Sequence, residues 1–362
     1  MRSRIESIFE WLEEEDPEAI VILNSVKPHV DKTFFYASGL YRGEFENCAL
    51  IMYPDHTAEM CVSKLESESA SKSDIPMDIM EDREELKEWL EEKLSDKKKI
   101  GINASELTYK GFEKIQDSTE ADIIDVSDAI IEARNRKDEK EIEILDKAGD
   151  IASSVAEEIT DHISEGMKEF KVAAELSYRM RQKGASGDAF EIIAGSGPNS
   201  AEPHYTSGKR ELQKGDFLVL DFGALYKRYR SDITRTYIIG EASDRQKKMY
   251  STVLEAQKAA LDMIEPGVEG AEVHNAAKEV IDSTEFEGKF IHGLGHSIGL
   301  STHDGSGLSP NVEVTLEPGM VFTVEPGIYI SDFGGVRIED DIVVTEEGYR
   351  LLTDADKEMR VL

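Results

Sequence analysis

The stretch FLVLDFGALYKRYRSDITRTY, residues 217–237, contains two apolar runs with one acidic residue in each. Asp221 lies in the first run and Asp232 at the start of the second. A tight turn centred on Tyr226 and Lys227 would pair the runs as antiparallel strands, with the two aspartates directly opposite each other. The stretch therefore predicts a β-hairpin that carries two facing carboxylates.

Alternation along the paired strands separates polar from apolar side chains. One face would hold Val219, Asp221, Gly223, Asp232 and Thr234, and the other Leu218, Leu220, Phe222 and Ile233. Opposed carboxylates repel each other, and the arrangement is destabilising unless a cation lies between them. The hairpin therefore indicates a cation site.

A second stretch has the same form: VFTVEPGIYISDFGGVRIEDDIVV, residues 321–344. Glu325 and Glu339 are symmetric about Asp332, and two glycines follow in the turn region. Arg337 is two residues from Glu339 and so shares its face. Each hairpin alone fits solvated edge carboxylates as well as a metal site. Two such hairpins that flank a histidine cluster favour the metal site.

That cluster is FIHGLGHSIGLSTHD, residues 290–304, which contains His292, His296 and His303. The first two are four residues apart, as in the helical zinc motif HExxH, but the glutamate is missing. The three glycines among these histidines would each cost a helix on the order of 1 kcal/mol. We therefore expect strand and loop here, with the backbone close to a ligand.

One imidazole with four carboxylates makes an oxygen-rich site, which suits manganese, cobalt or iron better than a thiolate zinc site does. Bridging carboxylates would allow two ions about 3.5 to 4 Å apart to share one water molecule. A further histidine, His204, follows Pro203 in EPHYTSGKRELQKGD. Spacing alone favours a structural role for it, and the same holds for His29, His56, His162 and His274.

The rest of the chain suggests two domains. Residues 1–136 alternate strand-like and helix-like segments without a GxGxxG or Walker sequence, which predicts an α/β support domain. The polar run ARNRKDEKE, residues 133–141, predicts a boundary. Residues 137–362 then read as an α+β domain. They include a long helix with the apolar stripe Ile144, Ala148, Ile151, Val155 and Ile159, and a later helix with Ser243 as N-cap.

Composition excludes several classes of function. The net charge of -33 should repel nucleic acid and anionic membranes, so neither is an expected partner. No apolar run approaches the ~18 residues that would span a bilayer, and the N-terminus lacks a signal-peptide core, so we expect a cytoplasmic protein. Cys48 and Cys61 are the only cysteines and are expected to be buried, free thiols.

The five predicted metal ligands are spread over four stretches of the chain. They lie within LVLDFGALYKRYRSDITRTY, HGLGHSIGLSTHD, TVEPGIYI and GVRIEDDIVVT, and are Asp221, Asp232, His296, Glu325 and Glu339. This pattern resembles that of the pita-bread metallopeptidases, in the prolidase and aminopeptidase P branch. The resemblance implies a creatinase/prolidase-like N-terminal domain over residues 1–136 and a pita-bread catalytic domain over 137–362.

For the metal site, the resemblance implies two divalent ions, Mn²⁺ first, with Co²⁺, Fe²⁺ or Zn²⁺ as alternatives. Asp221 would bind one ion, His296 and Glu325 the other, and Asp232 and Glu339 would bridge them.

The resemblance also implies roles for residues around the metals. His204 and His303 would steady the tetrahedral intermediate, Glu325 would transfer a proton, and His292 and Arg337 would line the substrate pocket. Thr302 departs from the pattern, because the family usually has Ile or Val before His303. Since Thr is β-branched like Val, we expect the strand to be kept and only the local pocket to differ.

The expected activity is hydrolysis of Xaa-Pro bonds in dipeptides or at the N-terminus of short peptides. Such a bond is a tertiary amide without N–H, which fits poorly into sites that recognise backbone N–H groups. Methionine aminopeptidase shares the five ligand types but normally lacks the first domain. Creatinase shares the fold but not the metal ligands. Non-catalytic relatives that serve as interaction modules have lost these ligands. All five are present here, which disfavours both alternatives. Relatives are commonly dimers, so we expect a homodimer.

Overall fold

The computed structural model describes residues 4–12 and 16–362 of the chain. Contacts divide it into two compact units, Met1–Arg134 and Asn135–Leu362. This division lies just before the boundary that we expected between residues 136 and 137.

The first unit contains a mixed sheet with the strand order β4-β3-β2-β1-β5-β6. Its central strand β1 is antiparallel to β2 and parallel to β5, as in α/β domains. Cys48 and Cys61 are both free and buried, as predicted. The strands are β1 (Ala19–Leu23), β2 (Ala49–Met52), β3 (Ala58–Ser63), β4 (Met77–Met80), β5 (Lys99–Ile102) and β6 (Asp122–Asp125). The helices are α1 (Arg4–Glu10), α2 (Lys32–Ser38), α3 (Ser67–Ala70), α4 (Arg83–Leu94), α5 (Tyr109–Gln116) and α6 (Ser127–Asn135).

The second unit is built on an antiparallel sheet with the order β15-β18-β12-β9-β8, and β19 pairs with β18. The strands of this sheet are β8 (Ile193–Ser196), β9 (Phe217–Phe222), β12 (Ile233–Ile238), β15 (Val321–Val324), β18 (Glu339–Thr345) and β19 (Gly348–Leu351). Smaller sheets are formed by β7 (Gly187–Asp188), β10 (Ala224–Tyr226) and β11 (Tyr229–Arg230), by β13 (Gly295–His296) and β14 (Gly307–Leu308), and by β16 (Gly327–Ile330) and β17 (Gly334–Arg337).

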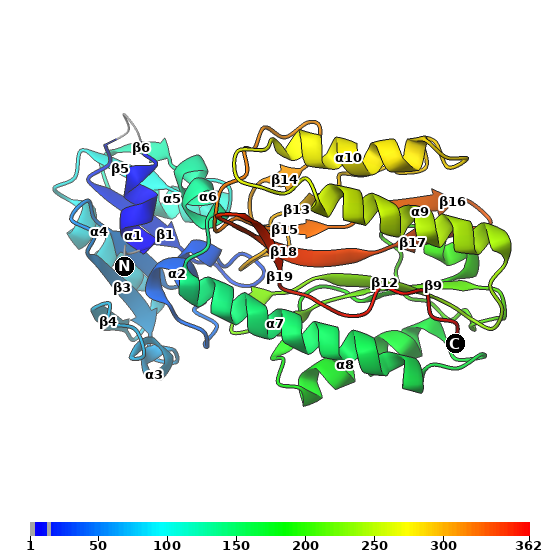
Figure 1. Ribbon diagram of the computed structural model, residues 1–362. Coiled ribbons are helices and arrows are strands. Elements are labelled where there is room, and N and C mark those ends of the chain that lie inside the picture. The colour runs from blue at the N-terminus through cyan, green and yellow to red at the C-terminus, as the bar shows by residue number, and fades with distance from the viewer. Residues whose placement is uncertain (1–3, 13–15) are drawn as a thin grey trace. The chain divides into compact units, whose positions relative to one another are not determined.

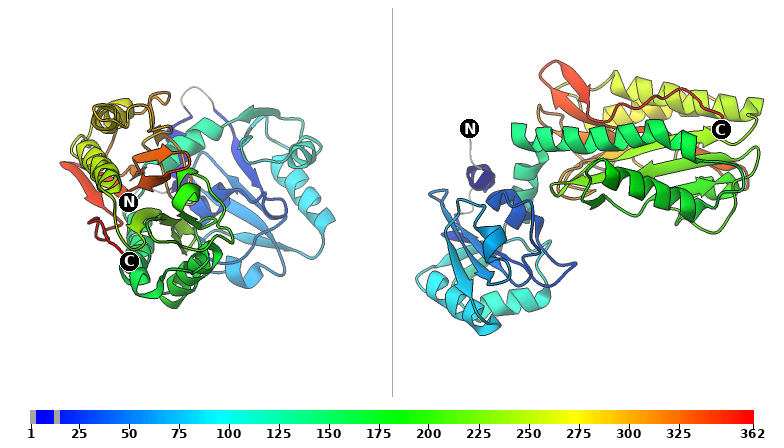
Figure 2. Two further views of the ribbon diagram at one scale, coloured as in Figure 1. Left: turned by 90° about the vertical axis from the view of Figure 1, so that its right-hand side faces the viewer. Right: turned by 90° about the horizontal axis from the view of Figure 1, so that it is seen from below.

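Two pairs of helices cover these strands. Helices α7 (Glu139–Glu158) and α8 (Glu169–Gln182) lie side by side in Figures 1 and 2, and Figure 1 shows α9 (Asp244–Leu261) and α10 (Gly270–Asp282) on the other side of the strands. Short 3₁₀ turns η1 (Ile159–His162) and η2 (Gly197–Ala201) complete the unit. The predicted apolar stripe of α7 is buried, and Ser243 caps α9 in a capping box with Gln246, as predicted.

The apolar face of the first hairpin packs against α7 and α8. Leu218, Leu220, Phe222 and Ile233 belong to a core cluster that also contains buried residues of both helices. Because side chains alternate along a strand, the polar face of β9 and β12 points the other way, toward the interior of the unit. The predicted separation of the two faces is confirmed.

The register of the first hairpin differs from the prediction. Asp221 pairs with Thr234 and not with Asp232, because the turn is centred on Lys227 and Arg228. Both turn residues have positive φ, 46° and 71°, as two-residue type I′ hairpins require. Asn or Gly would have marked this turn, and neither is present. The correction moves the pairing by two positions, so Asp232 keeps its predicted face and lies diagonal to Asp221.

The register of the second hairpin is confirmed. Gly327 pairs with Arg337 and Val324 pairs with Asp340, which is the symmetry predicted about Asp332. Asp332 itself has a φ of 62°. The two glutamates lie at the junction between the sheet of β15 and β18 and the sheet of β16 and β17. Glu325 directly follows β15, and Glu339 begins β18.

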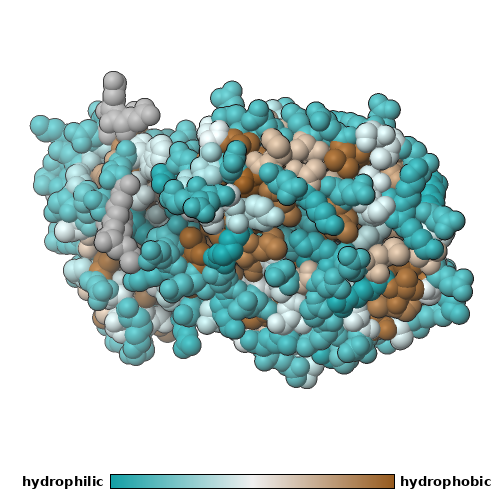
Figure 3. Space-filling model, viewed as in Figure 1, coloured by the Kyte–Doolittle hydropathy of each residue, from teal (hydrophilic) through white to brown (hydrophobic). Residues whose placement is uncertain are grey.

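On the face drawn in Figure 3, most described residues are hydrophilic and hydrophobic ones form smaller patches. Within the described residues, no helix is both long and apolar enough to cross a membrane.

Candidate active site

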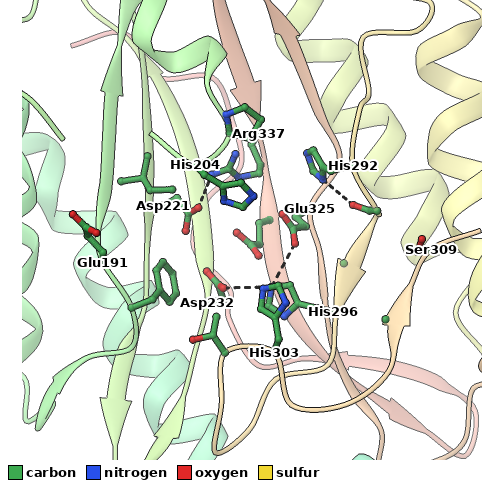
Figure 4. A pocket seen from close by; sticks show the side chains of 18 of the residues that line it. Glu191, His204, Asp221, Asp232, His292, His296, His303, Ser309, Glu325 and Arg337 are labelled. Carbon is green, nitrogen blue, oxygen red and sulfur yellow. Dashed lines mark hydrogen bonds and ion pairs between the residues drawn. The ribbon is translucent and has the colours of Figure 1, made fainter. Parts of the chain in front are cut away.

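A cavity of about 630 Å³ lies within the second unit. Every residue that the sequence predicts to act at the site lines this cavity, and Figure 4 labels most of them. These residues are His204, Asp221, Asp232, His292, His296, His303, Glu325, Arg337 and Glu339. His29, His56, His162 and His274 are not among its lining residues.

Neighbouring strands bring the carboxylates together. Asp221 is on β9, Asp232 directly precedes β12, and Glu339 begins β18, three strands that are adjacent in the sheet. Glu325 directly follows β15, which pairs with β18. The four carboxylates therefore reach one cavity although more than a hundred residues separate the first from the last.

The closest group is formed by Asp232, His296 and Glu339, whose potential ligand atoms all lie within 4.8 Å of one another. The Nε2 atom of His296 is 3.6 Å from Glu325 Oε1 and 3.8 Å from Asp232 Oδ2. Asp221 lines the same cavity, but its Oδ2 accepts a hydrogen bond from Arg337 Nη2 (Figure 4). The structure thus gathers three predicted carboxylate ligands around the imidazole of His296 and places the fifth ligand, Asp221, beside an arginine.

One hydrogen bond assigns the tautomer of His296. Its Nδ1 is 3.2 Å from the carbonyl oxygen of Ser297, which can only accept, so Nδ1 carries the proton. The Nε2 lone pair therefore points toward the carboxylates of Asp232 and Glu325. Burial lowers the pKa of His296 to about 4, so the ring is neutral. A lone pair among carboxylates is an arrangement that a bound cation stabilises.

A bound cation would also stabilise the carboxylates in their charged form. Burial, with repulsion from neighbouring carboxylates, raises the pKa of Asp232 and Glu339 well above the usual range. Burial also raises the pKa of Glu325 to about 8. In addition, Asp232 Oδ1 is buried without a hydrogen-bond partner. Hard oxygen donors and one imidazole fit a divalent ion such as manganese.

Tyr329 was not predicted as a site residue, although it connects two predicted pocket residues. Arg337 Nη1 donates to Tyr329 Oη at 2.8 Å, and this hydroxyl lies 2.9 Å from His292 Nε2. The Nδ1 of His292 donates to the carbonyl of Gly293, so Nε2 accepts the hydroxyl proton. Tyr329 pairs with Gly335, two residues from Arg337, so strand alternation could have identified it.

Two threonines were also missed as parts of the site. Thr234 Oγ1 donates to Glu339 Oε2 and accepts from Arg337 Nε at 3.1 Å. Thr323 Oγ1 accepts from the His296 backbone N–H at 3.0 Å and donates to Glu325 Oε1 at 3.2 Å. Each threonine is two positions from a predicted ligand on the same strand face, and this spacing is the signal that could have found them.

The remaining predicted histidines lie at the cavity wall. His204 is exposed in the loop between η2 and β9. The ring of His303 stacks on that of His296 with centroids 4.1 Å apart. Burial lowers the pKa of His303. Thr302, the position that departs from the family pattern, also lines the cavity, and Phe190 and Val312 add apolar surface.

Comparisons with known proteins agree with this geometry. The profile of metallopeptidase family M24 matches residues 143–346, and that of the creatinase/prolidase N-terminal domain matches residues 4–136. An Xaa-Pro dipeptidase of Pyrococcus horikoshii is 36% identical over 99% of both chains.

Two solved structures cover nearly the whole chain. The Xaa-Pro dipeptidase from Bacillus anthracis has a TM-score of 0.91 at 34% identity, over 99% of both chains. The X-Pro aminopeptidase from Thermotoga maritima has a TM-score of 0.89 at 33% identity, over 96% of this chain and 98% of that one. These matches confirm the predicted fold, an α/β N-terminal domain followed by an α+β pita-bread domain. The chain therefore belongs to metallopeptidase family M24 and carries a creatinase/prolidase N-terminal domain.

Proposed function

We propose that the protein is a metal-dependent exopeptidase that hydrolyses Xaa-Pro bonds in dipeptides or at the N-terminus of short peptides. The observation that carries this proposal is the convergence of four carboxylates and the free Nε2 of His296 in one cavity. Similarity to an Xaa-Pro dipeptidase over the full chain, first domain included, favours this function over that of methionine aminopeptidase.

In this proposal two divalent ions, Mn²⁺ first and Co²⁺, Fe²⁺ or Zn²⁺ as alternatives, are held by the five predicted ligands. When bound, the ions supply Lewis acidity and lower the pKa of the attacking water. The ligands are Asp221, Asp232, His296, Glu325 and Glu339. The raised carboxyl pKa values and the unpartnered oxygen of Asp232 support this assignment.

The protein's own groups would then handle charge and protons. His204 and His303 reach the cavity from its wall and would donate hydrogen bonds to the developing oxyanion. A well-placed donor of this kind contributes about 3 kcal/mol. Glu325 would take up the proton that the attacking water releases and deliver it to the proline nitrogen, because a tertiary amide nitrogen must be protonated before it leaves.

Arg337 would orient the site and the substrate pocket. Its guanidinium donates to Asp221, Thr234 and Tyr329, so its plane is held by three partners. His292 accepts from the Tyr329 hydroxyl in the same network, and both His292 and Arg337 line the cavity. We therefore assign these two residues to substrate binding.

The test is to load the metal-free protein with Mn²⁺ or Co²⁺ and compare hydrolysis of Ala-Pro, Ala-Pro-Ala and Met-Ala-Ser. Cleavage of Ala-Pro alone would indicate a dipeptidase, and cleavage of Ala-Pro-Ala an aminopeptidase. Cleavage of only Met-Ala-Ser would contradict the proposal.

A site test uses Glu325→Ala and His296→Ala, which should lose bound metal and activity together. Glu287→Ala and His162→Ala change the same residue types at exposed positions outside the cavity and should keep both. Full activity in either ligand variant would disprove the assigned metal site.

Two further properties stay predictions. We propose a cytoplasmic location, and a homodimer by analogy with relatives. Sedimentation equilibrium of the intact protein tests the second, and a mass equal to one chain at micromolar concentration would contradict it.

A further inference from the structure

Lys137 has an unusual environment for a lysine. Its side chain is 0% exposed, and its Nζ lies 3.8 Å from Oδ2 of Asp304, which is only 3% exposed. Lys137 belongs to the polar run of residues 133–141, which predicts a domain boundary. Burying an ammonium group costs free energy unless the group is paired and hydrogen-bonded. The buried partners of Lys137 therefore indicate what the residue does.

The ammonium group of Lys137 acts on the residue that orients His296. Its Nζ is 3.0 Å from Ser297 Oγ. The carbonyl oxygen of the same serine accepts the Nδ1 proton of His296. Partners of the second imidazole nitrogen fix the orientation of a metal-binding histidine. Lys137 is therefore one residue removed from the hydrogen bond that directs Nε2 into the cavity.

Asp304, the second partner of Lys137, holds the segment that bears His303 through hydrogen bonds to its backbone. Its carboxylate accepts from the backbone N–H groups of Leu300 and Ser301, and its own N–H donates to the carbonyl of Ser297 at 2.9 Å. A Cβ atom at Gly299 would lie 2.3 Å from Asp304 Oδ2, so the close approach requires glycine there. We call residues 296–306 the histidine loop.

Asn135, two residues before Lys137, binds the other end of the histidine loop. Asn135 Oδ1 accepts from the Ser306 backbone N–H at 3.1 Å, and its Nδ2 donates to Ser306 Oγ at 3.2 Å. The backbone N–H of Lys137 donates to the carbonyl of Gly319 at 2.9 Å. The stretch 135–137 is thus anchored itself and contacts both ends of the loop.

We propose that Lys137 is a positioning residue that holds the histidine loop, so that His296 presents Nε2 to the metal site and His303 lies against it. Lys137 does not line the cavity, and it acts through Ser297 and Asp304. This inference rests on the proposed function, because it assigns the residue's effect to the metal that His296 binds.

The test compares Lys137→Met with the wild-type protein. Methionine has a similar length but neither charge nor donor. We expect one of the two ions to bind at least ten-fold more weakly in calorimetric titration with Mn²⁺, since losing such supporting partners costs roughly 10–100-fold in metal affinity. The visible absorption of the Co²⁺-loaded protein should also change, because it reports ligand geometry.

The matched control is Arg179→Met. Arg179 is a partly buried cation that pairs with Glu158 at 3.2 Å and Glu175 at 2.7 Å on α7 and α8, away from the histidine loop. This variant should lower the melting temperature while both Mn²⁺ affinities stay within two-fold of the wild type. It separates general destabilisation from loss of positioning.

A second variant, Ser297→Ala, removes only the hydroxyl that Lys137 contacts. It tests the proposal even if Lys137→Met does not fold. We expect at least three-fold weaker binding of the same ion. Unchanged Mn²⁺ affinities and Co²⁺ spectra in the folded variants, even with a lower melting temperature, would overturn the proposal. Failure of the wild type to bind Mn²⁺ or cleave Ala-Pro would instead overturn the proposed function, before any variant is made.

Discussion

At the scale of single residues, one hydrogen bond from His296 to a backbone carbonyl decides which ring nitrogen faces the carboxylates. The lowered pKa of the ring keeps that nitrogen unprotonated at neutral pH. The raised pKa values of Asp232, Glu325 and Glu339 arise from the same burial and from repulsion by neighbouring carboxylates. These shifts describe a donor set that a divalent cation completes.

Tyr329→Phe should lower kcat/KM for Ala-Pro by roughly ten-fold while bound metal is unchanged. The substitution leaves Arg337 Nη1 and His292 Nε2 without the hydroxyl that joins them, and a hydrogen bond to a charged group is worth about 1.5 to 3 kcal/mol. Steady-state kinetics and metal analysis measure the two effects.

The control is Tyr237→Phe, which removes a buried hydroxyl bonded to the carbonyl of Ala156, outside the cavity. It should cost stability but not activity. Equal activity losses in the two variants would show that the Tyr329 hydroxyl has no specific role.

The metal-free protein should lose stability as the pH rises from about 4 to about 8. The folded state raises the pKa of Glu325 to about 8, whereas an unfolded glutamate ionises near pH ~4.3. A carboxyl with a raised folded-state pKa stabilises the fold fully below its unfolded pKa, and this contribution disappears as the pH passes the folded value. Urea unfolding at several pH values measures the free energy of unfolding.

Glu325→Gln isolates this contribution from that of the acidic surface, because glutamine cannot ionise. The decline in unfolding free energy with pH should be smaller in the metal-free variant than in the metal-free wild type. Identical slopes would mean that Glu325 titrates normally in the folded protein.

At the scale of elements, the two hairpins show how turn conformation sets register. The turn at Lys227 and Arg228 uses positive φ at both residues without Asn or Gly, so the sequence contained no signal for its centre. The turn at Asp332 was located correctly because two glycines and the symmetry of Glu325 and Glu339 pointed to it. In both hairpins each site residue lies on the predicted face of its strand. Side chains alternate with a period of two, so a register shift of two positions leaves every side chain on the same face.

Asp332→Val should lower the free energy of unfolding by about 1 to 2 kcal/mol, because a β-branched residue is strained at the observed φ of 62°. Asp332→Gly should instead raise it by up to about 1 kcal/mol. The residue is exposed, so packing does not confound the comparison. Chemical denaturation measures both changes.

Ser331→Val is the control at the neighbouring exposed position, where φ is not positive, and should change the unfolding free energy by less than about 0.5 kcal/mol. A gain in stability with valine at position 332 would show that the turn does not need the left-handed conformation.

At the scale of the whole molecule, metal binding and folding are linked. Mn²⁺ at a hundred times its dissociation constant should raise the free energy of unfolding by about 2.7 kcal/mol for each ion that binds, since the ions bind the assembled site and not the unfolded chain. Thermal unfolding with chelator and with Mn²⁺ tests this. His296→Ala should show a much smaller shift, and a shift equal to that of the wild type would place the binding elsewhere.

The sequence by itself determined the elements and the types of ligand. Helix caps, the apolar stripe of α7 and the alternation along β9 and β12 are local patterns, and local patterns depend on residues a few positions apart. Alternation along the two hairpins also placed Asp221, Asp232, Arg337 and Glu339 on faces that do line the cavity. The family resemblance supplied their proposed roles, which no spacing contains.

Only the tertiary structure decided which partners these residues have. It pairs Asp221 with Arg337, brings Tyr329 between Arg337 and His292, and buries Lys137 behind the histidine loop. The physical reason is that the cavity forms where β15, β18, β12 and β9 become neighbours. Contacts between residues so far apart in the chain depend on strand order and packing, and a local pattern carries no information about either.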